Sequence, residues 1–379
     1  MSRKLASIVE IESVCDIEDS DRLSVARMKG KGWNVVVGRG EFKPGDICVF
    51  FEIDSALDPD DERYAFLKER CLRKFVSNGG NVLREVIRIK TVKLRGVVSQ
   101  GLLMPISLFP EIEGNVVIRD GKMMVGIGGA EEELVGADVT SVLHVEHFDE
   151  IAASYVASSG DIAGPFPQMI PKTDEERIHN LKEWFSTMKG RRWQVTQKCD
   201  GMSCTIAYAP SIDQENPVIV CSRNYRVKLM DYNGITPTGW KMNIKYGISN
   251  KLKKLYEERG KEIALQGEIV GPGINKCRNK EKEHKFLVFR AWDIQKQEFV
   301  DPDKLEVFCH DNFILHVPVI AAGFSFFDEI VNMEEALKYA EGKTPEGNER
   351  EGVVCKTDDG GPYASFKIVS NKYLLKSGD

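Results

Sequence analysis

Lys198 is a residue whose neighbours could let it act as a nucleophile. It begins the tetrapeptide Lys198-Cys199-Asp200-Gly201. A lysine amine attacks an electrophile only when it is neutral, and burial or neighbouring cations can lower its pKa from about 10.4. Asp200 could hold a hydrated magnesium ion beside the amine, because magnesium prefers oxygen ligands. By itself the tetrapeptide is typical of an exposed turn, so a catalytic function depends on what the rest of the chain supplies.

The sequence around Lys198 predicts a β-hairpin. Residues 193–198 read as one strand, residues 199–202 as a turn and residues 203–208 as the returning strand. Gly201 would permit a tight turn. We therefore expect Lys198 at the rim of a hairpin.

A helix is predicted shortly before this hairpin. Residues 173–176 have the spacing of a capping box, and Ile178, Leu181, Phe185 and Met188 fall on one face of a helix. Strands with helices between them follow, which is typical of an α+β domain.

The amino-terminal part of the chain, from residue 5 to about residue 108, predicts a small β-barrel of short strands separated by turns. Residues 87–90 alternate apolar with basic side chains, and residues 92–95 resume one step out of phase, as a β-bulge near Thr91 would cause. One face would then carry Arg88, Lys90, Lys93 and Arg95. An OB-fold that binds nucleic acid through these four residues fits this pattern.

The net charge of -6 does not favour a nucleic-acid partner, but the distribution of basic residues does. They gather in three runs, which are Arg84, Arg88, Lys90, Lys93 and Arg95, then Lys241, Lys245, Lys251, Lys253 and Lys254, and finally Lys276, Arg278, Lys280, Lys282 and Lys285. Each run alone is typical of a solvated face. Together they favour a polyanionic partner.

Composition indicates a soluble intracellular protein of two domains. The chain has 379 residues, 42% of them hydrophobic and 29% charged, and no apolar run approaches the ~18 residues of a membrane span. Its amino terminus lacks a secretory signal, and nine cysteines without a CxxC pair favour reduced thiols over zinc or disulfides. We expect a monomer in the cytoplasm or nucleus, with no membrane partner.

Six segments, in order along the chain, resemble the motifs of the covalent nucleotidyltransferase superfamily of ligases and capping enzymes. They are Lys-Cys-Asp-Gly at 198–201, Cys-Ser-Arg-Asn at 221–224, Gln-Gly-Glu-Ile-Val-Gly at 266–271, Phe-Arg-Ala-Trp-Asp-Ile at 289–294, Glu-Gly-Val-Val-Cys-Lys at 351–356 and Ser-Phe-Lys-Ile at 365–368. The resemblance implies that Lys198 carries AMP, Arg223 contacts the nucleotide and the end to be joined, Glu268 holds the ribose, Phe289 stacks on the base, Glu351 binds metal with Asp200, and Lys367 grips the α-phosphate.

The amino-terminal half narrows this resemblance. Residues 21–23, 38–42, 51–55 and 171–177 look like the corresponding parts of Deinococcus- and Naegleria-type RNA ligases. Such enzymes form a lysine-linked AMP from ATP with Mg2+ or Mn2+, pass AMP to a 5'-phosphate and let a 3'-hydroxyl displace it. The resemblance therefore implies an ATP-dependent RNA ligase that repairs nicked duplexes containing RNA.

Two positions depart from the pattern of these ligases. Gln197 stands where a glutamate is common, and its amide could both accept from adenine N6 and donate to a ring nitrogen, which favours ATP over GTP. Ser365 stands where a lysine is common and cannot replace its charge. Lys356 is a candidate to supply that charge instead, although strict alternation from Glu351 would place it on the opposite strand face.

These observations predict an α+β protein with an OB-fold domain at 1–150, a linker at 151–170 and an antiparallel nucleotidyltransferase domain at 171–379. Two other functions stay open, a capping-type guanylyltransferase and a non-catalytic nucleic-acid-binding protein.

Overall fold

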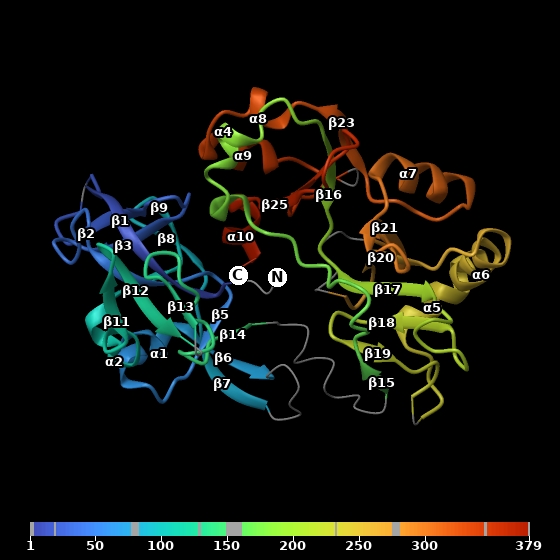
Figure 1. The fold of residues 1–379 in the computed structure, drawn as a ribbon, viewed down its shortest axis with the longest axis horizontal. Helices are drawn as coiled ribbons and strands as arrows, with labels where there is room; N and C mark the ends of the chain where they lie inside the picture. Colours follow the sequence, from blue (N-terminus) through green and yellow to red (C-terminus); the bar gives the residue numbers. More distant parts are fainter. Residues whose placement is uncertain are drawn as a thin grey trace. The chain divides into compact units, whose positions relative to one another are not determined.

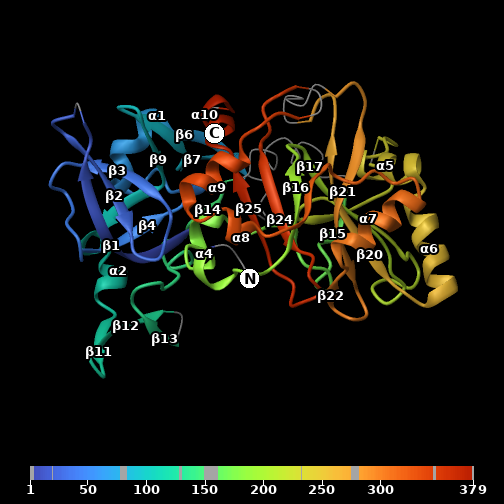
Figure 2. The ribbon, with the colours of Figure 1, turned by 90° about the horizontal axis from the view of Figure 1, so that it is seen from above.

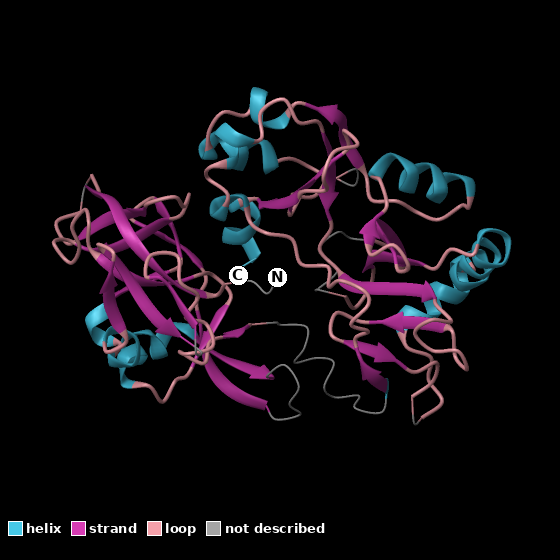
Figure 3. Cartoon of the chain, in the orientation of Figure 1, coloured by secondary structure: helices cyan, strands magenta, loops and turns pink. Residues whose placement is uncertain are grey.

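The computed structural model describes residues 4–18, 20–76, 83–127, 130–148, 161–231, 233–274, 281–344 and 347–377. It divides into two compact units. The first comprises Met1–Ala157, His179–Glu183 and Leu374–Asp379, and the second comprises Ser158–Ile178 and Trp184–Tyr373. The strands of both units pair antiparallel with their neighbours, and Figure 3 shows them in magenta. Among the described residues, no helix combines the length and apolar character that a membrane crossing requires.

The first unit is built from short antiparallel strands around an apolar core. A five-stranded sheet has the order β10 (Leu102–Pro105), β4 (Ile47–Phe51), β1 (Ala6–Asp16), β2 (Leu23–Met28) and β3 (Asn34–Gly38). A four-stranded sheet has the order β14 (Glu146–His147), β5 (Ser55–Leu57), β7 (Leu83–Arg88) and β6 (Leu72–Val76), and β8 (Thr91–Leu94) pairs with β9 (Val97–Gln100). Ile8, Phe51, Ile87 and Phe109 meet in the core, which stabilises the unit because apolar burial is favourable.

The first unit contains a further sheet beyond the barrel predicted for residues 5 to about 108. Strands β11 (Val116–Arg119), β12 (Lys122–Ile127) and β13 (Ala130–Glu133) form a separate three-stranded sheet of the first unit (Figure 2). In the predicted linker, residues 151–160 lie outside the described part of the chain. The next residues form β15 (Ile162–Pro165), a strand of the second unit.

The basic stretch of the first unit is not one bulged strand, so that prediction is wrong. β7 ends at Arg88 and β8 begins at Thr91 in a different sheet, and this break accounts for the change of phase. Arg88 is buried, donates to Asp54 at 3.0 Å and lies 4.6 Å from the ring centroid of Phe148. Its charge is therefore neutralised inside the unit. Lys93 and Arg95 are exposed, and Lys90 is half-buried.

The second unit contains two sheets (Figure 1). The seven-stranded sheet has the order β15, β19 (Tyr225–Val227), β18 (Val218–Cys221), β17 (Met202–Tyr208), β20 (Ile263–Val270), β21 (Lys285–Asp293) and β22 (Glu298–Phe299). The four-stranded sheet has the order β23 (Val319–Phe324), β16 (Trp193–Lys198), β24 (Gly352–Thr357) and β25 (Ser365–Val369). The longer helices are α5 (Thr238–Tyr246), α6 (Ile248–Arg259), α7 (Pro302–Asp311) and α9 (Met333–Ala340).

Alternation along the four-stranded sheet separates an apolar face from a basic one. Trp193 and Phe366 pack with ring centroids 5.1 Å apart, and Phe327 packs 5.5 Å from Trp193. Cross-strand partners share a face, and the register pairs Lys198 with Gly352, and Val354 with Lys367. Because side chains alternate along a strand, burial of Trp193 and Phe366 on one face directs Lys198 and Lys367 to the other.

The predicted hairpin around Lys198 does not form. β16 pairs with β23 and β24, whereas β17 pairs with β18 and β20. The turn at 199–201 therefore passes from one sheet to the other rather than folding a strand back on its neighbour. Lys198 lies at the end of a central strand, beside this passage.

The predicted helix across residues 173–188 is also wrong. Only a 3₁₀ turn at Ile178–Asn180 and the four-residue helix α4 (Trp184–Thr187) occur there. Residues 174–177 are extended against β25 instead, since Lys367 N donates to Glu176 O at 2.8 Å and Arg177 forms a bridge with Lys367. The carbonyl oxygen of Glu176, which would accept a hydrogen bond within a helix, accepts one from β25 instead.

Candidate active site

Three carboxylates surround the amine of Lys198. Its Nζ donates to Glu351 Oε1, and Glu351 directly precedes β24. Burial alone would lower the pKa of Lys198, but the charges of Glu351, Glu268 and Asp200 outweigh burial and raise it. Neighbouring cations would lower the pKa of a lysine. The charged groups around Lys198 are carboxylates, which have the opposite effect. The amine is therefore protonated in this state and must lose a proton before it can attack.

Gly201 lets the turn after Lys198 approach β20 closely. A Cβ atom on Gly201 would lie 2.4 Å from Ile269 O and 2.8 Å from Glu268 Cγ, which no side chain tolerates. Gly352, opposite Lys198 on β24, has a similar constraint, because its Cβ would lie 2.0 Å from Ile368 O. Glycine is needed here for close backbone contact rather than for a tight turn.

Glu268 and Arg223 lie on the large sheet beside Lys198. Burial raises the pKa of Glu268 to about 8, against the opposing charges of Lys198 and Arg223. Arg223 lies in the turn between β18 and β19, with NH2 3.8 Å from Asp174 Oδ2. A half-buried acceptor and a cation on one side of the amine suit a polar, anionic ligand.

Asp200 and Glu351 have the chemistry to hold a hard divalent cation. Glu351 Oε2 is buried and has no hydrogen-bond partner among the described residues, and Asp200 Oδ2 accepts from Tyr373 Oη. A magnesium or manganese ion would satisfy the orphaned oxygen. The part of the chain that the structure describes has no cluster of three or more His, Cys, Asp or Glu side chains suited to a metal, so water and phosphate oxygens would complete the coordination shell.

An apolar cluster adjoins the amine. Phe289 and Leu287 on β21 pack against Cys199, Val270 and Val317. Gln197 lies on the sheet face opposite Lys198, and its Nε2 donates to Cys199 Sγ at 3.9 Å. Gln197 and Phe289 therefore reach the same cluster.

Lys356 lies on the same sheet face as Lys198 and Lys367. The argument from strict alternation fails because Glu351 lies before β24 rather than within it. Lys356 Nζ donates to Phe289 O and lies 5.6 Å from the centroid of the Phe289 ring. Burial lowers the pKa of Lys356 to about 8. Lys356 therefore contacts Phe289, the residue predicted to stack on the base, and within the described part of the chain its amine makes no hydrogen bond to Ser365.

Comparison with known proteins identifies the family. Residues 191–369 match the RNA ligase family model, and residues 5–106 match an OB-fold domain model. A glutamate-to-alanine variant of the Naegleria gruberi RNA ligase, solved with ATP and manganese, is 30% identical, with 100% of both chains covered and a TM-score of 0.79. The chain belongs to the RNA ligase family. The predicted α+β class with an amino-terminal OB-fold is confirmed.

Two further structures of the Naegleria gruberi RNA ligase support the assignment. The complex with pyrophosphate is 30% identical, with 98% of each chain covered and a TM-score of 0.76. A glutamate-to-alanine variant with AMP and manganese is also 30% identical, with 99% of this chain and 100% of that chain covered and a TM-score of 0.77. The curated proteins gave no match.

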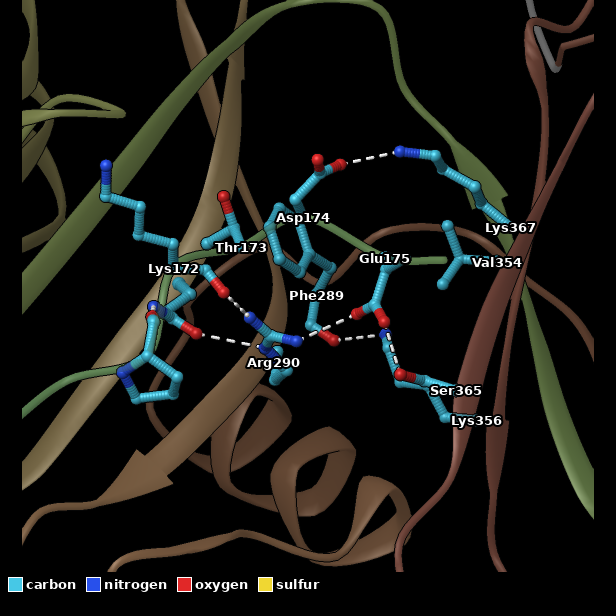
Figure 4. A network of polar contacts seen from close by, with 12 residues as sticks. Lys172, Thr173, Asp174, Glu175, Phe289, Arg290, Val354, Lys356, Ser365 and Lys367 are labelled. Carbon is cyan, nitrogen blue, oxygen red and sulfur yellow. Dashed lines mark hydrogen bonds and ion pairs between the residues drawn. The ribbon is translucent and has the colours of Figure 1, made fainter. Parts of the chain in front are cut away.

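The segment 171–177, here called the strap, contributes groups to this RNA ligase site that sequence reasoning missed. Arg290 donates to Glu175 Oε1 at 2.8 Å and to Lys172 O at 2.9 Å, and Ser365 Oγ donates to Glu175 Oε2 (Figure 4). Lys367 Nζ donates to Asp174 Oδ1 at 2.6 Å. The sequence identifies the strap only by its resemblance to RNA ligases. Its capping-box spacing predicts the start of a helix instead of these contacts. No sequence signal indicated that Tyr373 would contact Asp200.

Of the residues predicted in the nucleotide motifs, the structure brings Lys198, Asp200, Glu268, Glu351, Arg223 and Lys367 into one charged group, with Phe289, Gln197 and Lys356 at the adjoining cluster. The predicted nucleic-acid-binding residues belong to the other unit. The prediction that Arg88 binds nucleic acid is corrected, because its charge is buried against Asp54.

Proposed function

We propose that this RNA ligase joins 5'-phosphate and 3'-hydroxyl ends by way of an AMP carried on Lys198. One observation carries the proposal. A lysine amine at the end of a central strand meets Glu351, Glu268 and Asp200, with an apolar cluster alongside. The three carboxylates and the cations Arg223 and Lys367 fit the two needs of nucleotidyl transfer, which are proton removal from the amine and charge neutralisation on the phosphate.

The first step uses ATP as AMP donor. The Lys198 amine, after losing its proton, forms a bond to the α-phosphorus of ATP, and the bond to pyrophosphate breaks. Lys367 and Arg223 offset negative charge on the phosphate oxygens, and Glu268 accepts hydrogen bonds from ribose hydroxyls. Phe289 offers its ring to adenine, and Gln197 offers an amide.

Asp200 and Glu351 would hold Mg2+ or Mn2+, and such an ion would supply positive charge to this part of the site. That charge would oppose the carboxylates that raise the pKa of Lys198. The relatives solved with ATP or AMP contain manganese, which supports the same requirement here.

The polynucleotide steps follow from the AMP adduct. AMP passes from Lys198 to a 5'-phosphate, and a 3'-hydroxyl then displaces AMP to seal the strand. We propose a nick in an RNA-containing duplex as the substrate, bound in part through Lys90, Lys93 and Arg95 of the first unit, two of which are exposed.

The test is the mass of the intact protein after incubation with ATP and magnesium. Wild type should gain the mass of AMP, and the modification should map to Lys198. Lys198→Ala should gain none, whereas Lys189→Ala, which removes an exposed lysine of the same unit, should behave as wild type. An adduct of unchanged yield on Lys198→Ala would sink the assignment.

A further inference from the structure

One carboxylate of the strap touches both cations that the proposed function assigns to the phosphate. Asp174 Oδ1 accepts from Lys367 Nζ at 2.6 Å, and Asp174 Oδ2 lies 3.8 Å from Arg223 NH2. Figure 4 shows the Asp174 side chain turned toward Lys367, which comes from the facing strand β25. Lys367 lies on β25 of the four-stranded sheet, and Arg223 lies in the turn between β18 and β19 of the seven-stranded sheet, so Asp174 links the two sheets at this point.

The strap is held firmly on both sides of Asp174. Glu175, with a side chain 9% exposed, accepts from Arg290 and Ser365. Thr173 Oγ1 lies 3.1 Å from Ser203 Oγ on β17, and Glu176 O accepts from Lys367 N. These contacts anchor the backbone, so Asp174 reaches the cations without any movement of the strap.

Asp174 differs from Glu175 in being accessible. Its side chain is 37% exposed, and its ionic partner Lys367 is 10% exposed. A lysine this buried needs an anion, because an unpaired buried charge is costly. A phosphate oxygen meets that need at least as well as a carboxylate, since both form charge-assisted hydrogen bonds. Only one of them can occupy the same side of Lys367.

We propose that Asp174 is a positioning residue that occupies the phosphate subsite in the absence of nucleotide, holding Lys367 and Arg223 in place until a phosphate group displaces its carboxylate. The inference rests on the proposed function for the identity of the ligand. The contacts of Glu175 with Arg290 and Ser365 anchor the strap, whereas Asp174 has a separate role toward Lys367 and Arg223. Asp174 sets the affinity of the site for polyphosphates, because every bound phosphate must first compete with it and then lie near its negative charge.

The experiment compares Asp174→Asn with wild type by calorimetric binding of ATP, inorganic tripolyphosphate and adenosine, without divalent metal. Asp213→Asn is the matched control, because Asp213 also pairs with an arginine of this unit, Arg226, at 2.7 Å. Asp174→Asn should bind ATP and tripolyphosphate about fivefold more tightly, the scale of one partly exposed charge pair. Its affinity for adenosine, which has no phosphate, should not change. The gain should shrink as salt screens the charges.

Unchanged or weaker binding of both polyphosphates by a folded Asp174→Asn protein overturns the inference, and an equal gain for adenosine does so too. If Asp174→Asn fails to fold, Asp174→Ser provides the same comparison. In adenylylation, the variant should lower the ATP concentration for half-maximal rate without raising the maximal rate, a split that a purely structural residue would not produce. A tripolyphosphate gain without any AMP adduct on wild type would sink the proposed function alone. An adduct on wild type without the gain would sink this inference alone.

Discussion

At the scale of single residues, the site places its charges where nucleotidyl transfer needs them but not in the state that the reaction needs. Lys198 is surrounded by acids, and its pKa is raised above the ordinary value. A nucleophilic amine must be neutral. Under the proposed function, the carboxylates would hold metal and accept the proton, and they would not activate Lys198 by themselves.

Lys367 is predicted to stabilise charge on the phosphate rather than to support folding. Lys367→Ala should remain folded and lose at least ~100-fold in the rate of adenylylation, the scale of one positioned electrostatic donor. Single-turnover formation of the AMP adduct measures the rate, and circular dichroism checks the fold. Lys356→Met is the comparison variant, because Lys356 shares the sheet face but contacts Phe289. It should mainly weaken ATP binding. A near-normal rate for Lys367→Ala would transfer the role to Lys356.

The residues of the nucleotide motifs could be predicted from the sequence, because each motif is local and keeps its order along the chain. Ser365 shows where that reasoning stops. A serine in place of a lysine reads as a lost charge, yet its hydroxyl binds Glu175, a residue 190 positions earlier. This hydrogen bond forms because β25 and the strap lie side by side in the fold. The residues of either segment do not by themselves predict that the two segments are neighbours.

At the scale of elements, two predictions failed for the same physical reason. Residues 193–208 have the length and turn of a hairpin, and residues 173–188 have the spacing of a helix. In both cases long-range partners prevailed over local preference, because β16 pairs with β24 and the strap pairs with β25. The outcome matters for function, since it brings Lys198 to Glu351 and Asp174 to Lys367.

The basic strands of the first unit are predicted to contact the nucleic-acid backbone through β8 and its flanks rather than through Arg88. Replacing Lys90, Lys93 and Arg95 with glutamine should weaken nick binding and reduce the salt dependence by a slope of about 0.9 for each lost phosphate contact on duplex DNA. Binding isotherms at several salt concentrations measure both. The control replaces Lys29, Lys43 and Lys122, exposed lysines of other strands and turns in the same unit.

Equal affinity and equal slope in the Lys90, Lys93 and Arg95 variant would place the nucleic-acid surface elsewhere, and the second and third basic runs are the alternatives. In the second run, Lys253 and Lys254 pair with glutamates one turn away at 3.7 Å. In the third, Lys276, Arg278 and Lys280 lie outside the described residues, and Lys285 pairs with Glu281 at 2.7 Å.

At the scale of the whole molecule, the chain separates two kinds of chemistry between its units. All six nucleotide motifs lie in the second unit, whereas the OB-fold and its exposed basic residues lie in the first. The division fits a reaction with one small and one polymeric substrate. We therefore expect formation of the AMP adduct to depend on the residues of the second unit, and sealing to depend on both units.

The preference for ribose or deoxyribose beside the break tests the proposal that the protein seals RNA-containing nicks. We predict efficient sealing when the nucleotides at the 3'-hydroxyl end are RNA and poor sealing when they are DNA, with little dependence on the sugar at the 5'-phosphate side. A site that hydrogen-bonds a 2'-hydroxyl, or that fits A-form geometry, rejects deoxyribose because its own polar groups would be left unpaired. Nicked duplexes that differ only in one or two sugars beside the nick provide the measurement, scored for sealed strands and for adenylylated 5' ends. If all-DNA nicks were sealed as fast as those with a ribose 3' end, the chain would act as a general polynucleotide ligase, and recognition of RNA would not lie at the 3' end.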